Sequence, residues 1–214
     1  MPDDDPPPLV SVVIPTYNYA RFLGEAIESA QAQAGVPVEI IVVDDGSKDD
    51  PAAVVHRYPG VRLIRQDNSG LAAARNTGWR NAVGRFVVFL DADDRLIPNA
   101  LCANLANFTA CPDCGFVYGG YRFIDADGQV RKPASLVEIG ADPFASFLRG
   151  NAIGMHATVM YRRAALEEVG GFDPTLRACE DYDLYLRLSP RHPVAVTQDC
   201  IAEYRIHEIG RAHV

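Results

Sequence analysis

The first half of the chain alternates short apolar runs with stretches of helical spacing. The apolar, β-branched runs that predict strands lie at 9–15, at 38–47 with an acidic turn at the end, at 61–66 and at 85–94. The stretches that predict helices lie at 20–33, 49–58 and 69–82, the last with Ser69 as a candidate N-cap. This alternation indicates βαβ units, and therefore a mostly parallel sheet with helices on both faces.

The second half is less regular. Its pattern predicts two strands around an Asp127-Gly128 turn within 114–132, a short helix at 141–150, a strand and helix within 156–173, a helix at 179–189 and a last strand at 192–200. No internal repeat and no linker is visible, so we expect a single domain at 9–207 after a disordered, acidic and proline-rich leader at 1–8.

Polar clusters follow three of the predicted strands. They are Pro15-Thr16-Tyr17-Asn18, Asp44-Asp45-Gly46-Ser47 and Asp91-Ala92-Asp93-Asp94. Because parallel sheets bind ligands outside the carboxyl ends of their strands, the three clusters predict one shared site.

The residue types in these clusters suggest a metal-bound nucleotide. Asp91 and Asp93 are two positions apart, so at a strand end they point to the same side and suit a hard cation such as Mg²⁺ or Mn²⁺. Asp45 can accept a hydrogen bond from a base or a ribose, and Tyr17 offers a ring for stacking. Arg75 can meet a phosphate or an Asp. The plainer alternatives are a solvated acidic turn and a surface arginine.

Composition narrows the partners and the compartment. The 214 residues carry a net charge of −8 with no Lys/Arg block, which argues against nucleic acid. No apolar run reaches the ~20 residues of a membrane span, and no secretory signal is present. Five cysteines do not suggest a disulfide framework, so we expect Cys111-Pro-Asp-Cys114 to be reduced structural thiols of a cytoplasmic protein, ahead of a metal or redox pair.

Five motifs in order resemble those of the family-2 glycosyltransferases, which have the GT-A fold. They are VSVVIPTYN, VVDDGS, NSGLAAARNTG, FLDADD and EDYDLYLRL, and the resemblance covers roughly 9–207. It implies a Rossmann-like, mostly parallel central sheet with helices on both faces. It also implies a donor half at 9–98 and a less regular acceptor half at 99–207.

The resemblance also implies roles for individual residues. The nucleotide would be held by Pro15, Thr16, Tyr17, Asn18, Asp45, Arg75 and Asp91. Asp93 would be the direct ligand of Mn²⁺ or Mg²⁺, with Asp91 nearer the ribose and His207 as a further metal or phosphate contact. Asp181 would be the catalytic base, with Glu180 beside it. For His207 a surface histidine is the alternative.

The implied reaction is a single in-line displacement with inversion. A nucleoside-diphosphate sugar, expected to be UDP- or dTDP-linked, would donate its sugar to a hydroxyl of a saccharide, lipid-linked or protein acceptor. Asp181 would take the proton, and the helix dipole would favour its ionised form. Peripheral association with the inner face of the cell membrane is compatible with this role.

Three other readings compete with this one. A phosphatase with an Asp-x-Asp nucleophile needs an early strand and a later lysine, whereas the only lysines here are Lys48 and Lys132. A nucleotidyltransferase usually has a glycine-rich basic loop where this chain has PTYNYARF. The third reading is an inactive, nucleotide-binding fragment of a glycosyltransferase.

The last seven residues, EIGRAHV at 208–214, fit no expected helix or strand. They can be back-translated into a string that matches a common sequencing-library adapter. We therefore expect 208–214 to be a non-native tail. On this expectation the native C-terminal elements that complete the acceptor site are replaced by the tail and are missing from the sequence.

Overall fold

The computed structural model describes residues 9–133 and 136–207. The strands are β1 (Val10–Thr16), β2 (Val38–Asp44), β3 (Arg62–Arg65), β4 (Phe86–Phe89), β5 (Arg95–Leu96), β6 (Phe116–Ile124), β7 (Val130–Pro133), β8 (Met160–Arg162) and β9 (Val194–Arg205). The helices are α1 (Ala20–Gln31), α2 (Pro51–Val55), α3 (Leu71–Arg80), α4 (Ala100–Ala110), α5 (Pro143–Arg149), α6 (Arg163–Val169) and α7 (Glu180–Leu188), with a 3₁₀ turn η1 (His156–Thr158). The predicted leader and tail lie outside the described residues.

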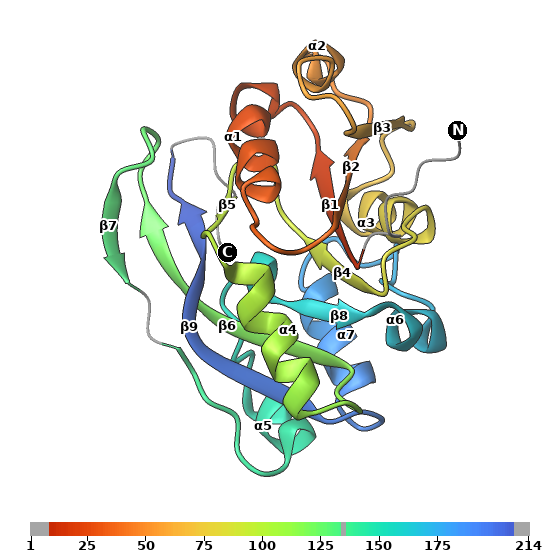
Figure 1. Ribbon diagram of the computed structural model, residues 1–214. Helices are drawn as coiled ribbons and strands as arrows, with labels where there is room; N and C mark the ends of the chain where they lie inside the picture. Colours follow the sequence, from red (N-terminus) through yellow and green to blue (C-terminus); the bar gives the residue numbers. More distant parts are fainter. Residues whose placement is uncertain (1–8, 134–135, 208–214) are drawn as a thin grey trace, which may run out of the picture.

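Within the described ranges the strands form one nine-stranded sheet (Figure 1). Their order is β3-β2-β1-β4-β8-β6-β9-β5, and β7 pairs with β6. The part built from β3, β2, β1 and β4 is parallel, as the alternating pattern predicts. The strand β8 is antiparallel to both β4 and β6, which joins the first half to the less regular second half.

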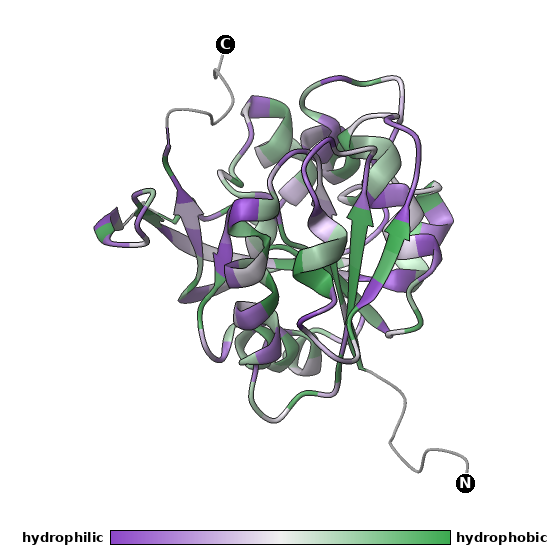
Figure 2. Ribbon diagram, turned by 90° about the horizontal axis from the view of Figure 1, so that it is seen from above, coloured by the Kyte–Doolittle hydropathy of each residue, from purple (hydrophilic) through white to green (hydrophobic). Residues whose placement is uncertain are grey.

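Helices cover both faces of the sheet. The helices α1, α2 and α4 pack on one face, and α3, α5, α6 and α7 pack on the other. Every residue of β1 is buried. The strand lies between the two layers of helices, and its Val and Ile side chains pack alternately against one layer and the other. In Figure 2 the hydrophobic colour is accordingly concentrated on the central strands.

The carboxyl ends of β1, β2 and β4 lie at one edge, and each continues into a polar loop. Gly46 shows how closely these loops approach. Its φ is +78°, and a Cβ there would lie 2.9 Å from the backbone nitrogen of Asn68. The turn after β2 is therefore held against the loop before α3.

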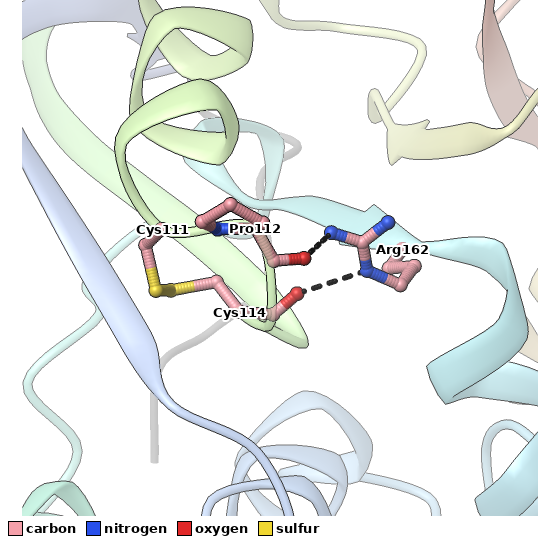
Figure 3. The surroundings of a disulfide bond; sticks show 4 residues. All are labelled: Cys111, Pro112, Cys114 and Arg162. Carbon is pink, nitrogen blue, oxygen red and sulfur yellow. Dashed lines mark hydrogen bonds between the residues drawn. A yellow bond between two sulfur atoms is a disulfide. The ribbon is translucent and has the colours of Figure 1, made fainter.

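The cysteine expectation is wrong, because Cys111 and Cys114 form a disulfide (Figure 3). A turn after α4, closed by a hydrogen bond from the Cys114 nitrogen to the Cys111 carbonyl, brings the two Cα atoms to 5.5 Å. Arg162 donates to the carbonyls of Pro112 and Cys114, which fixes the same turn. Sequence spacing alone could not distinguish this turn from two separate thiols.

No helix in the described ranges is both long and apolar enough to cross a bilayer.

Candidate active site

A cavity of about 480 Å³ opens at the carboxyl ends of the first-half strands. Nine of the predicted site residues line it: Pro15, Thr16, Tyr17, Asp45, Arg75, Asp91, Asp93, Glu180 and Asp181. The last two come from α7 in the second half, so the cavity joins segments that are about ninety residues or more apart in the sequence. The remaining two predicted residues, Asn18 and His207, are not part of this lining.

Asp45 ties the end of β2 to the start of α3. Its buried carboxylate accepts hydrogen bonds from the Gln66 side chain and from the backbone N–H groups of Ser69 and Gly70. The predicted N-cap is therefore wrong: Gly70 is the N-cap of α3, and the Ser69 hydroxyl donates to the backbone carbonyl of Asp67 instead. A carboxylate has about four acceptor positions, so Asp45 retains one for a ligand.

The loop after β1 offers an unsatisfied polar group to the cavity. The Thr16 hydroxyl is buried and has no hydrogen-bond partner among the described residues. Tyr17 is 43% exposed at the same loop. Asn18 has a φ of 61°, and its side chain accepts a hydrogen bond from the Lys48 nitrogen. Asn18 therefore holds the loop against the turn after β2 and does not face the cavity.

Arg75 is a buried bridge between the two halves. One guanidinium nitrogen lies 2.9 Å from Asp91 and the other lies 2.8 Å from Glu180. Burial opposes the charge of Arg75, but Asp91, Glu180 and Asp181 outweigh it and raise the pKa of the guanidinium. Arg75 therefore holds two acids, rather than facing solvent, and Glu180 is occupied by an ion pair.

Asp93 lies deeper in the same acidic turn. Burial and the charge of Asp91 raise the pKa of Asp93. The hydrogen bond to Nε2 of His207, 3.0 Å from the Asp93 carboxylate, lowers it but does not outweigh them. His207 is itself buried between the rings of Tyr19 and Phe22, with centroids at 5.8 and 4.9 Å. The histidine thus does not line the cavity itself, but it contacts Asp93, which does.

A divalent cation fits this donor set in the way that Mg²⁺-like ions are usually bound. Within the described residues no three His, Cys, Asp or Glu side chains converge into a ready-made metal cage. Asp91 and Asp93 do line one cavity, and a cation bound there would relieve the repulsion by which Asp91 helps to raise the pKa of Asp93. One or two carboxylates together with substrate phosphates are a typical Mg²⁺ site.

The third acid of the turn has a structural task. Asp94 is buried and accepts a hydrogen bond of 2.9 Å from the Arg205 nitrogen. The Arg205 side chain donates to the Asp93 carbonyl, to the Ala126 carbonyl and to Glu25. Burial, followed by the charges of Asp93 and Asp91, raises the pKa of Asp94 well above its usual range.

Asp181 occupies the first turn of α7, at the edge of the cavity. Its Oδ1 accepts a hydrogen bond of 2.7 Å from the Tyr182 nitrogen, so Oδ2 is the atom left to meet a substrate. Burial raises the pKa of Asp181; Arg75 opposes this and Glu180 reinforces it. Burial therefore outweighs the opposing charge of Arg75, and the raised pKa makes Asp181 a stronger base than a free Asp.

Several lining residues were given no role of their own from the sequence, although Ala92 and Asp94 lie in the predicted acidic cluster. They are Tyr19, Asn68, Gly70, Leu71, Ala74, Ala92, Asp94, Gly154, Met155, His156, Cys179, Tyr204 and Arg205. Arg205 lies two positions before His207, and this proximity is the only feature of the sequence that could have placed Arg205 near the site. The 154–156 segment carries no motif, and only the folded chain brings it to the cavity.

Comparisons with known proteins agree with this geometry. The family model described as "Glycosyl transferase family 2" matches residues 11–170. An uncharacterized glycosyltransferase of Rickettsia felis is 33% identical over 94% of this chain. The chain spans only 34% of that relative's length.

Two solved structures show the same fold. Staphylococcus aureus TarS 1-349 in complex with UDP-GlcNAc aligns with a TM-score of 0.74 at 21% identity, over 93% of this chain and 59% of TarS. The mannosyltransferase PcManGT from Pyrobaculum calidifontis, in complex with GDP-Man and Mn²⁺, aligns with a TM-score of 0.74 at 23% identity, over 98% of this chain and 60% of PcManGT. The predicted GT-A fold is thus confirmed.

Proposed function

The chain belongs to glycosyl transferase family 2, and we propose that it transfers a sugar from a nucleoside-diphosphate sugar to an acceptor hydroxyl with inversion. One observation carries the proposal: a single cavity joins the acidic turn of Asp91 and Asp93 to the carboxylate of Asp181. Such an arrangement can hold a diphosphate at one end and take a proton at the other.

The nucleoside would lie against the β1 and β2 loops. Thr16 supplies a buried hydroxyl in need of a partner, and Asp45 supplies one remaining acceptor position. Tyr17 would offer its exposed ring to the base. We propose a UDP- or dTDP-linked sugar; TarS binds UDP-GlcNAc, while PcManGT binds GDP-Man.

Asp93 and Asp91 would hold Mn²⁺ or Mg²⁺, which when bound neutralises the departing diphosphate. PcManGT was solved with Mn²⁺, which supports the use of a divalent ion by a protein of this fold. Arg75 fixes Asp91, and His207 orients Asp93 by hydrogen bonding to its carboxylate. His207 is thus proposed to support the metal ligand, which revises its expected direct contact.

Asp181 would act as the general base. Its Oδ2 would accept the proton of the acceptor hydroxyl while that oxygen attacks the anomeric carbon from the face opposite the diphosphate. Glu180 cannot share this task while Arg75 holds it, so we assign it to positioning α7. A raised pKa suits Asp181, because a base works best when its pKa lies nearer the working pH.

A nucleotide-sugar panel tests the proposal. Thermal unfolding with UDP-GlcNAc, dTDP-glucose and GDP-mannose, each with Mn²⁺ or with a chelator, should show stabilisation by at least one donor that depends on the metal. Release of free sugar or transfer products would distinguish an enzyme from an inactive nucleotide-binding fragment. Absence of any stabilisation would contradict the proposal, and release of pyrophosphate from a nucleoside triphosphate would favour a nucleotidyltransferase.

A further inference from the structure

A second cavity of about 460 Å³ lies in the second half of the chain. Its described lining comes from β6, from the segments at 132 and 136–137, and from the 151–154 loop. The first cavity contains Asp181, whereas the second contains none of the residues assigned above to donor, metal or base. The proposed transfer of the sugar therefore assigns no ligand to this second cavity.

The two cavities adjoin at Gly154, which lines both. The ring of Tyr121 lies against this glycine: a Cβ at position 154 would fall 2.4 Å from the Tyr121 hydroxyl. Any larger residue at 154 would push Tyr121 from its place. The absence of a side chain at Gly154 thus keeps the aromatic wall of the second cavity close to the reaction site.

The chemistry of the lining combines aromatic rings with polar groups. Tyr121 and Phe123 pack edge to face with ring centroids 5.3 Å apart, and both rings line the cavity. No hydrogen bond of the Tyr121 hydroxyl is found among the described residues, and burial raises the pKa of this hydroxyl, which keeps it a donor. Asn151, which is exposed, adds amide donors, while its oxygen accepts a hydrogen bond from the Ile153 backbone nitrogen.

Charge and shape favour a sugar over other acceptors. Among the described lining residues Lys132 is the only charged side chain, so the cavity has little to hold a lipid-linked diphosphate. The lining also includes Leu136, Val137, Ala152 and Ile153, but its polar groups make it a poorer fit for an acyl or polyprenyl chain than a purely apolar groove would be. A pyranose ring presents an apolar C–H face and a rim of hydroxyls, which matches aromatic rings bordered by a phenol and an amide.

We propose that the second cavity is an acceptor subsite for a saccharide of at least two units, with one sugar against Tyr121 and Phe123 and the next presented to Asp181. The inference rests on the proposed transferase function, because an acceptor subsite is needed only if Asp181 takes a proton from an acceptor hydroxyl. It names the class of acceptor, which the donor-side geometry leaves open.

A glycan array probed with the whole chain in the presence of UDP and Mn²⁺ tests the inference. The parent should bind saccharides of two or more units in preference to single sugars. Tyr121→Ala should lower the affinity for these saccharides roughly tenfold or more, a usual loss when a central aromatic contact is truncated. Gly154→Ala, which displaces the same ring, should cause a similar loss. Tyr58→Ala, a remote tyrosine bonded to Glu28, serves as the matched control and should bind like the parent.

Donor binding, measured on the same preparations by thermal shift with UDP-GlcNAc and Mn²⁺, separates the two claims. Donor binding without saccharide binding, or saccharide binding equal in the parent and both variants, would overturn the subsite and leave the proposed transferase intact. Preferential retention of peptides or lipids in a parallel binding screen would also overturn it. Failure to bind any nucleotide sugar would contradict the proposed function itself, and the acceptor subsite with it.

Discussion

The acidic turn after β4 gives three neighbouring aspartates three different environments. Asp91 is paired with Arg75, Asp93 faces His207, and Asp94 accepts the Arg205 backbone N–H. Identical side chains therefore differ in what they can bind: all three aspartates line the cavity, but the buried Asp94 is committed to the Arg205 backbone N–H, which leaves Asp91 and Asp93 as the ligand candidates. The partner of each carboxylate, rather than the density of charge, separates a ligand candidate from a structural group.

Replacing Asp93 should remove metal-dependent binding. In Asp93→Ala, the affinity for UDP measured by calorimetry with Mn²⁺ should fall to the value seen with a chelator, because the proposed direct ligand is lost. Far-UV circular dichroism should remain that of the parent. The exposed Asp127→Ala in the β6–β7 turn is a control for a lost carboxylate. Equal UDP affinity with Mn²⁺ in parent and Asp93→Ala would show the turn to be merely solvated.

Replacing Asp181 should separate chemistry from donor binding. Asp181→Asn keeps the shape but cannot take the proton, so transfer should fall by roughly 10²–10⁴-fold while UDP binding stays near that of the parent. Asp183→Asn, in the same helical turn but paired with Arg187, is the matched control. Near-parental transfer by Asp181→Asn would remove Asp181 from the mechanism and turn attention to Asp183.

The pH dependence of transfer follows from the same carboxyl. Burial raises the pKa of Asp181, and a base acts only when unprotonated. The rate should therefore fall as pH is lowered through this raised pKa, at a pH above the value of about 3.9 expected for a free Asp. A pH–rate profile of the parent checks this, and an acid limb at or below that value would contradict it.

At the scale of elements, the site depends on loops that hold one another. Asp45 at the end of β2 fixes the loop before α3, and Asn18 after β1 holds the turn after β2. The helix α3 then carries Arg75 to Asp91 and to the start of α7. A change in one loop should therefore affect both stability and ligand binding.

Asp45→Ala is the test of this double role. Two backbone N–H groups would lose their acceptor, so the free energy of unfolding in urea should fall by about 0.5–2 kcal/mol, as for a lost helix cap. UDP affinity should also fall, by a similar factor with Mn²⁺ and with a chelator, because the proposed contact is to the nucleoside. Asp50→Ala, which removes the cap of α2 away from the cavity, controls for stability alone. Loss of UDP affinity only when Mn²⁺ is present would assign Asp45 to the metal site.

The sequence predicted elements better than their contacts. The β-branched runs predicted the positions of β1, β2 and β4 to within a few residues of their observed bounds. Strands that are buried on both faces have a continuous apolar pattern, which is easy to recognise. The helix α4 and the short β5 were not predicted. The disulfide and the bridge from Arg75 to Glu180 could not be predicted, because they depend on how distant segments meet.

At the scale of the whole molecule, Arg205 connects segments from the beginning to the end of the described chain. Its side chain is fully buried, bonds to Glu25 on α1, and reaches the Ala126 carbonyl beyond β6. It also donates from Nε to the Asp93 carbonyl. The acidic turn is therefore held by the last described strand, and its stability depends on the complete sheet.

This arrangement gives the last prediction, which concerns stability and pH. Burial and the nearby charges of Asp93 and Asp91 raise the pKa of Asp94 well above its unfolded value, so the folded state binds a proton more readily than the unfolded state. The stability contributed by this group is then present at low pH and is lost as pH rises through the folded pKa. Asp94→Asn retains an acceptor oxygen for the Arg205 N–H without a buried charge. In metal-free protein it should unfold at higher urea than the parent near neutral pH, and the advantage should shrink as pH falls toward about 4. Asp127→Asn, at an exposed position, should show no such trend. A difference between Asp94→Asn and the parent that is constant with pH would mean that Asp94 titrates alike in both states.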